Sequence, residues 1–234
     1  MNGAIESTTQ ADQVYGQLRS SILNGRLAPG ERIRMNFVAS DMSVSLGAVR
    51  EALSRLAAEE IVIATAQRGY RVASLSCEEL NDLTETRIAL EQICLRASIA
   101  EGGIEWEASL AAALHRLLRL PEYEDDECPQ LSMAWSQAHD GFHTALVSGD
   151  RSVWMNKFRN SLYHQAERYR RLSVPLRIED RDVAGEHRLL CEAALARDAE
   201  GACELMRSHL TRTSEILLRS PLLTSAERLG AISD

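Results

Sequence analysis

The sequence predicts a mostly α-helical protein of two domains: three helices and a β-hairpin at the N-terminus, then an all-helical bundle. Two observations predict this arrangement. Apolar residues recur at helical spacing along nearly the whole chain, and only residues 61–72 contain short runs typical of strands. Charge is also divided unevenly, because residues 1–75 carry a net charge of +1 and residues 76–234 carry −9. We therefore expect domains at residues 1–75 and 76–234.

The composition excludes several classes of protein. Of the 234 residues, 45% are apolar, which is enough for a packed core. No run of ~18 apolar residues occurs, so we expect no membrane-spanning helix and no membrane partner. Residues 1–10 lack the pattern of a signal peptide, which argues against secretion. The five cysteines are odd in number and form no CxxC pair, which disfavours a disulfide framework and a zinc ribbon. A reduced, cytoplasmic protein fits these features best.

The first two helices of the N-terminal domain are short. Residues 11–24 carry apolar side chains at helical spacing, and Gly25 is typical of the position just after a helix end. A second helix is expected at residues 35–42, with Phe37 and Val38 turned inward.

A tight connection at Ser43 leads into a third helix. Ser45 is expected to be its N-cap, and the helix should end near residue 59. Residues 61–63 then form a strand, and residues 69–72 form its returning partner. Two helices joined by a short turn and followed by a hairpin are typical of a winged helix-turn-helix, whose third helix enters the major groove of DNA.

The net charge of −8 would argue against a nucleic-acid partner, but the acidity lies in the second domain. At the start of the third helix, Ser45 and Gly47 would bring small groups close to phosphates, and Arg50 would project a cation. The alternative is a small helical domain in which Arg50 merely pairs with Glu51 or another acid.

Three segments of this domain resemble the GntR superfamily of bacterial regulators: RLAPGER at 26–32, VSLGAVREALSRL at 44–56 and RGYRV at 68–72. The resemblance implies a homodimer that binds a near-palindromic operator. Leu46 stands where many members have a base-reading Arg, and it could contribute only an apolar contact, such as one with a thymine methyl. The DNA-facing residues that the resemblance implies are Asn36, Ser45, Leu46, Gly47, Ala48, Arg50, Arg68 and Gly69.

After residue 75 the apolar pattern is helical and no strand is indicated. Gly102-Gly103, Pro121 and residues 148–150 interrupt the pattern, and Asp198 is expected to cap the last helix. The domain is therefore predicted to be a bundle of about six helices. Their expected ranges are 79–101, 106–120, 133–147, 152–172, 180–197 and 198–218.

All six histidines lie in this second domain. His139 and His143 are four residues apart, so they share one helix face and can chelate one metal ion. His187 and His209 lie almost equally far from the turn at Arg197-Asp198, so antiparallel helices bring them to the same height. Four neutral imidazoles favour a divalent transition metal, zinc first, with nickel or another metal as alternatives. Otherwise these histidines are ordinary polar or packed helix residues.

Further segments resemble the FCD effector domain, which defines the FadR branch of this superfamily: ETRIALE at 85–91, FHTAL at 142–146 and EHRLL at 186–190. The resemblance implies a metal site of one Asp and three His. His143, His187 and His209 match the three histidines, and His139 occupies the Asp position. This exchange would leave the bound metal one charge unit more positive, which favours an anionic effector.

The resemblance also implies that a small organic acid, a dicarboxylate or hydroxy acid, binds at the metal and at Arg87, since Arg holds carboxylates in bidentate fashion. The alternative for Arg87 is an intrahelical pair with Glu91. Tyr163, Arg168 and Arg170 are expected to border the same cavity, and residues 163–171 resemble the GlaR/CsiR-like regulators of glutarate and related short acids.

The sequence thus predicts a homodimeric, ligand-responsive transcriptional regulator, more often a repressor in this family, and not an enzyme. One rival is a metalloenzyme in which the metal activates water. It is disfavoured because Asp140 and Glu186 are expected on other helix faces than the histidines, which leaves no paired general base. The other rival is a protein with a purely structural metal and no effector.

Overall fold

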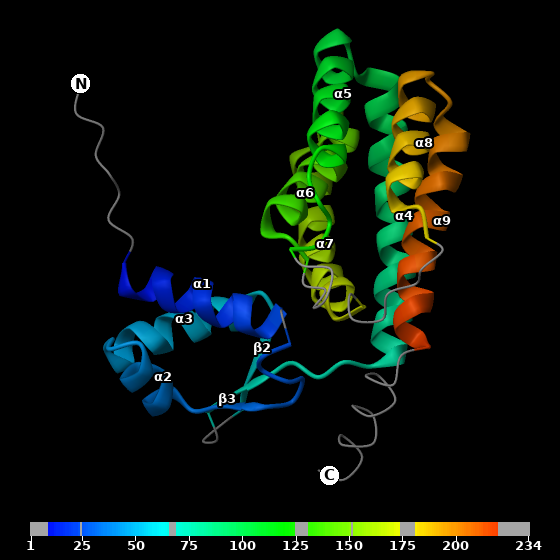
Figure 1. Ribbon diagram of the computed structural model, residues 1–234. Coiled ribbons are helices and arrows are strands. Elements are labelled where there is room, and N and C mark those ends of the chain that lie inside the picture. Colours follow the sequence, from blue (N-terminus) through cyan, green and yellow to red (C-terminus); the bar gives the residue numbers. More distant parts are fainter. Residues whose placement is uncertain are drawn as a thin grey trace, which may run out of the picture. The chain divides into compact units, whose positions relative to one another are not determined.

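The structure is a computed structural model that describes residues 9–23, 25–65, 69–124, 131–150, 152–173 and 181–219. The described elements form two compact units, one ending at Ser76 and the other beginning at Cys77. Figure 1 shows the elements of both units. Among the described residues, no helix combines the length and apolarity needed to cross a membrane.

In the described residues, the N-terminal unit contains three helices and a small sheet. They are α1 (Gln10–Leu23), β1 (Arg32–Ile33), α2 (Met35–Asp41), α3 (Leu46–Ala58), β2 (Val62–Thr65) and β3 (Gly69–Val72). The strands are antiparallel in the order β1-β3-β2, with Ile33 opposite Tyr70 and Val72 opposite Val62. The predicted hairpin is therefore present, and β1 adds a third strand along the edge of β3. A strand of two residues has no periodicity of its own, so the sequence pattern did not indicate it.

The start of α3 is fixed by the backbone before it. Ser43 has a positive φ of 53°, which turns the chain sharply after α2. Ser45 then caps α3, because its hydroxyl accepts a hydrogen bond from the backbone N–H of Ala48 at 3.2 Å. The cap predicted from the sequence is thus confirmed, and the next residue, Leu46, begins a helix with one face left exposed.

The opposite face of α3 is the centre of the N-terminal core. Val49, Leu53 and Leu56 are completely buried, as is Val14 of α1. The prediction for α2 was partly wrong, because Phe37 is 69% exposed. With only seven residues, α2 buries none of its side chains fully and packs on the core through partly buried ones such as Val38.

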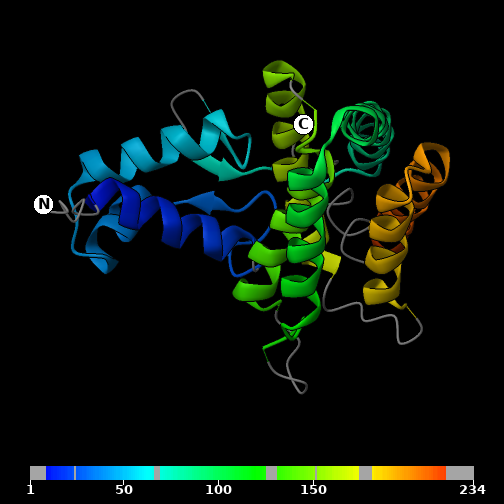
Figure 2. The same cartoon turned by 90° about the horizontal axis from the view of Figure 1, so that it is seen from above.

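The second unit consists of six helices in the described part of the chain. They are α4 (Cys77–Glu101), α5 (Ile104–Leu118), α6 (Met133–Val147), α7 (Val153–Ser173), α8 (Val183–Leu195) and α9 (Ala199–Leu218). All six lie within a few residues of the predicted ranges. Both views show α5, α6 and α7 on one side of α4 and the α8–α9 pair on the other (Figure 2). An isolated β-bridge between Tyr123 and Leu131 precedes α6.

The turn between α8 and α9 determines which residues of the two helices face each other. Arg197 adopts a positive φ of 61°, and the Asp198 carboxylate accepts a hydrogen bond from the backbone N–H of Gly201 at 2.9 Å. The predicted cap at Asp198 is confirmed. Because this turn is short, α8 and α9 run antiparallel to each other. His187 and His209 lie at similar distances from the turn along their helices.

Candidate metal centre

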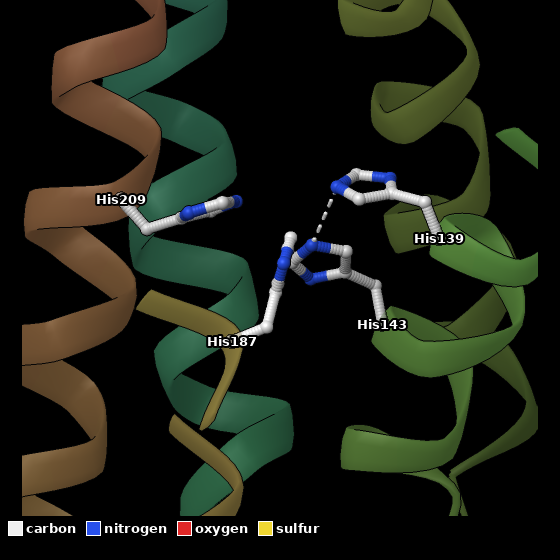
Figure 3. Close-up of side chains that lie close together, drawn as sticks. All are labelled: His139, His143, His187 and His209. Atoms are coloured by element: carbon white, nitrogen blue, oxygen red, sulfur yellow. Dashed lines mark hydrogen bonds between the residues drawn. The ribbon is translucent and has the colours of Figure 1, made fainter. Parts of the chain in front are cut away.

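Four histidines meet inside the helical unit. His139 and His143 come from α6, His187 from α8 and His209 from α9, and their rings converge on one point (Figure 3). All four residues are buried and are 5% exposed or less. The sequence predicted this convergence from the four-residue spacing on one helix and the matched heights on the other two.

The geometry fits a bound metal ion. Nε2 of His139 and Nε2 of His143 lie 3.2 Å apart, and one potential ligand atom from each of the four histidines lies within 4.8 Å of the others. Two nitrogens that bind one zinc ion at about 2.1 Å lie roughly 3.4 Å from each other. Within the described residues, Nε2 of His187 is buried and has no hydrogen-bond partner. A buried ring nitrogen without a partner is costly unless something binds it.

The electrostatics keep these imidazoles neutral. Burial lowers the pKa of all four rings, and the charges that the other imidazoles would carry lower those of His139, His143 and His187 further. For His187 the pKa falls to about 2. Neutral imidazole presents the lone pair that a metal needs, so at neutral pH the cluster offers four uncharged nitrogen ligands.

Two neighbours orient the outer nitrogens of these rings. Nδ1 of His139 lies 3.3 Å from the hydroxyl of Tyr163. Nδ1 of His209 donates a hydrogen bond to the Glu186 carboxylate at 2.7 Å, which leaves Nε2 of His209 free to bind an ion. A carboxylate behind a ligating histidine fixes the ring and strengthens it as a ligand.

The expectation that Glu186 lies on a face away from the histidines was therefore wrong. Glu186 precedes His187 on α8, but α9 packs on the side toward which its carboxylate points, and the Arg181 and Arg212 guanidiniums bind it at 2.8 and 3.0 Å. Burial raises the pKa of Glu186, but the hydrogen bonds from His209 and Arg181 outweigh this and lower it well below 4.5. No residue spacing signals this contact, because it depends on the packing of two helices.

A pocket opens beside the histidines. His139 and His209 form part of its wall, so a ligand in the pocket could reach an ion at the cluster. The described residues that line it are Leu80, Thr84, Arg87, His139, Tyr163, Ala166, Glu167, Tyr169, Arg170, His209, Leu210, Thr213, Ser214 and Leu217. Three of the four effector-binding residues predicted from the sequence, Arg87, Tyr163 and Arg170, are in this wall.

The fourth, Arg168, is not among the described residues that line the pocket. It is buried and binds the Glu79 carboxylate at 3.3 Å. Arg170 is in the wall but forms two hydrogen bonds to Glu167, at 2.8 and 2.7 Å. A ligand would therefore meet the Arg170–Glu167 pair, which has no net charge.

Arg87 is held less firmly. Its Nε lies 3.6 Å from a Glu91 oxygen, which is too long for a hydrogen bond, and neither atom has a hydrogen-bond partner among the described residues. The guanidinium carbon lies 5.0 Å from the centre of the Tyr163 ring. Burial lowers the pKa of Arg87, and the Glu91 charge partly offsets this. The intrahelical pair that we considered as an alternative is thus incomplete, and Arg87 retains capacity for a ligand.

The predicted DNA-facing residues lie mostly on the surface of the N-terminal unit. Asn36, Ser45, Leu46, Gly47 and Arg50 are exposed, and Ala48 and Gly69 are partly exposed. Arg68 lies outside the described residues. Within the described part of the chain, no hydrogen bond or ion pair ties down Arg50, contrary to the alternative in which it pairs with a neighbouring acid such as Glu51.

Both domains match known families. The family model "FCD domain" matches residues 82–212, and the model "Bacterial regulatory proteins, gntR family" matches residues 10–72. The chain is 42% identical to the uncharacterized HTH-type transcriptional regulator BphR of Paraburkholderia xenovorans (strain LB400), with 91% of this chain and 86% of that protein covered. It is 39% identical to the HTH-type transcriptional repressor GlaR of Escherichia coli (strain K12), with 84% and 90% covered.

Solved structures show the same fold. A GntR transcriptional regulator from Rhodococcus sp. RHA1 superimposes with a TM-score of 0.69 over 89% of this chain and 97% of that one, at 22% identity. At this identity, the likeness concerns the fold alone.

Proposed function

Since the chain belongs to the gntR family of bacterial regulatory proteins and carries an FCD domain, we propose that it is a homodimeric repressor that releases its operator when a small organic acid binds. The observation that carries this proposal is the pocket in which Arg87 lies beside a cluster of four buried histidines. The relative GlaR is a repressor by name, which supports repression rather than activation as the mode of regulation. Because its target is bacterial DNA, we place the protein in the cytoplasm.

His139, His143, His187 and His209 would hold a divalent transition metal, with zinc as our first choice and nickel or another as alternatives. The bound ion would supply positive charge and an open coordination position for an anionic group. The chain's own residues then determine how a ligand lies: Arg87 would bind a carboxylate, and the Tyr163 hydroxyl beside His139 would add a hydrogen bond.

A dicarboxylate or hydroxy acid fits this wall best. One carboxylate would face the histidines and a second one Arg87, while Thr84, Thr213 and Ser214 offer hydroxyl groups for the remaining polar atoms. Apolar residues such as Leu80 and Leu217 would contact the carbon chain. If the acid binds one domain arrangement more tightly than the other, it changes the affinity of the protein for DNA. Bound DNA then changes the affinity of the protein for the acid by the same factor.

The direct test is a titration of acids against the protein bound to DNA. A genomic fragment selected by the purified, zinc-loaded protein serves as operator, and dicarboxylates and 2-hydroxy acids of three to six carbons are added. We expect at least one acid to release the DNA, and chelation of the metal to abolish this response. DNA release that persists without the metal would contradict sensing at the metal, and a metallated protein that binds DNA but responds to none of the acids would favour a structural metal.

A second copy of the chain would explain the surface of α7. Trp154 and Phe158 lie one turn apart, are 66% and 58% exposed, and their ring centres are 6.1 Å from each other. Val153 beside them is also exposed. Apolar side chains gathered in this way on a protein surface commonly mark an interface, and a dimer is what recognition of a near-palindrome requires.

Substitution of both aromatics by Asp, Trp154→Asp with Phe158→Asp, is expected to convert the dimer to a monomer at micromolar concentration. Aromatic residues at the centre of an interface each contribute about 2 kcal/mol or more, so loss of both should weaken the dimer about 1,000-fold. Light scattering coupled to size-exclusion chromatography measures the mass. Ile104→Asp is the matched control, since Ile104 of α5 is 78% exposed and lies on a different helix. A double variant that remains dimeric would place the interface elsewhere.

The metalloenzyme rival gains no support from Glu186, the carboxylate that accepts a hydrogen bond from His209. Glu186 binds Arg181, Arg212 and His209, and its pKa is lowered, so it holds a proton weakly and is a poor general base. Turnover of an acid by the zinc-loaded protein would nevertheless favour the enzyme over the regulator.

A further inference from the structure

A buried group of three charged residues lies behind the pocket. Glu91 of α4 is completely buried, and Arg159 of α7 is 1% exposed. Arg159 donates a hydrogen bond from Nε to a Glu91 oxygen at 2.8 Å. The other Glu91 oxygen faces Arg87 at 3.6 Å. Two guanidiniums thus share one carboxylate, and the group carries one net positive charge.

The carboxylate is divided unequally between the two guanidiniums. Arg159 has the short contact, whereas Nε of Arg87 and the Glu91 oxygen that faces it both lack a hydrogen-bond partner among the described residues. Arg87 lines the pocket, and Arg159 is not among the described residues that do. Both guanidinium carbons lie against the Tyr163 ring, at 5.0 and 5.8 Å from its centre. Since Arg87 lines the pocket, a ligand there would meet the net positive charge of the group at Arg87.

We propose that Glu91 sets the charge of the effector that the pocket accepts, by neutralising Arg159 and leaving Arg87 with one charge for a ligand carboxylate. This inference rests on the proposed function of the pocket and deepens it, because it assigns selectivity to residues behind the wall. Glu91 and Arg159 are positioning residues that act through Arg87. A ligand with one carboxylate facing the histidines needs a second one to satisfy Arg87, so the pocket would select dianions over monoanions of the same length.

The balance of charge can be changed in both directions without altering the pocket wall. Glu91→Gln keeps the shape of the side chain and an oxygen for Arg159, and it raises the net charge of the group from +1 to +2. Arg159→Met fills a similar volume and lowers the net charge of the group to zero, because the Glu91 carboxylate then neutralises Arg87 alone. The double variant returns the charge to +1. Glu85→Gln, an exposed acid on the same helix, is the matched control for the loss of a carboxylate.

The experiment measures binding to full-length, zinc-loaded protein by isothermal titration calorimetry. Glutarate is compared with pentanoate, and succinate with butyrate, so that each pair differs in one carboxylate at constant length. Coulomb interactions at a partly buried site predict that Glu91→Gln raises the dianion-to-monoanion affinity ratio about tenfold and that Arg159→Met lowers it about tenfold. The double variant and Glu85→Gln should stay within about threefold of the wild type. Metal content is measured for each variant.

A merely structural role for Glu91 would lower the melting temperature of both single variants but leave the affinity ratio unchanged, and that result would overturn the inference. If Glu91→Gln does not fold, Arg159→Met and the double variant decide the question by the same ratio. If the wild type binds neither dicarboxylate, the proposed effector class fails and this inference fails with it. If the wild type binds them and no variant shifts the ratio, this inference alone is wrong.

Discussion

Arg50→Ala is expected to weaken operator binding about 10- to 100-fold while leaving the fold and the proposed dimer intact. The side chain is exposed on α3, and no ion pair or hydrogen bond holds it within the described part of the chain. Its removal therefore costs the protein little stability. Loss of one Arg contact to a base typically costs about 1–3 kcal/mol of binding free energy.

The effect should be large because the N-terminal domain has little other charge to use. Residues 1–75 carry a net charge of only +1, so one guanidinium is a substantial part of the attraction to DNA. Fluorescence anisotropy with the selected operator measures the affinity, and its salt dependence separates a phosphate contact from a base contact. Arg207→Ala is the matched control, because Arg207 is an exposed arginine of α9 that pairs only weakly, at 3.6 Å, with Glu204. Unchanged affinity in Arg50→Ala would contradict the proposed recognition helix.

His187→Ala is expected to lose the metal while the DNA-binding domain stays folded. His187 is 1% exposed, and its unpartnered Nε2 belongs to the cluster in which four ring nitrogens converge. Loss of even an outer partner of a metal ligand costs 10- to 100-fold in affinity, so loss of a ligand itself should cost at least about 100-fold. Metal content after dialysis, measured by mass spectrometry, reports the result.

The matched control is His164→Ala, because His164 is an exposed histidine on α7 that is not part of the cluster. It should keep the wild-type metal content. Circular dichroism checks that the helical unit of His187→Ala remains folded, and DNA binding checks the other domain. A folded His187→Ala protein with undiminished metal would reject the proposed centre.

The sequence predicted the parts of this structure that depend on local patterns. Caps at Ser45 and Asp198 follow from side chains that bind backbone a few residues away, and the His139–His143 pair follows from helical periodicity. The height match of His187 and His209 was predictable because a short turn joins their helices. For these features, the interacting groups lie within one helix or one helical hairpin.

The features that escaped prediction depend on how separate helices and strands pack against one another. Arg159 binds Glu91, which lies 68 positions away in the sequence. β1, which pairs with β3, is only two residues long. Glu186 reaches His209 because of how α8 and α9 are rotated against each other. A single sequence contains no pattern that gives the rotation of one helix against another. The rotation of the short helix α2 was equally unknown, so Phe37 was predicted to be a core residue.

The positions of the four histidines along the chain also affect how the helical unit would open. His143 and His187 are 44 residues apart and lie on helices that are not neighbours in sequence. An ion held by the cluster would act as a reversible cross-link between α6 and the α8–α9 hairpin, closing a long loop of the chain. These helices would then unfold together rather than one by one. When metal is added, hydrogen exchange of the backbone amides in α6 and in α9 would therefore slow by similar factors. The concentration of available metal would thus determine how rigid the effector-binding helical unit is.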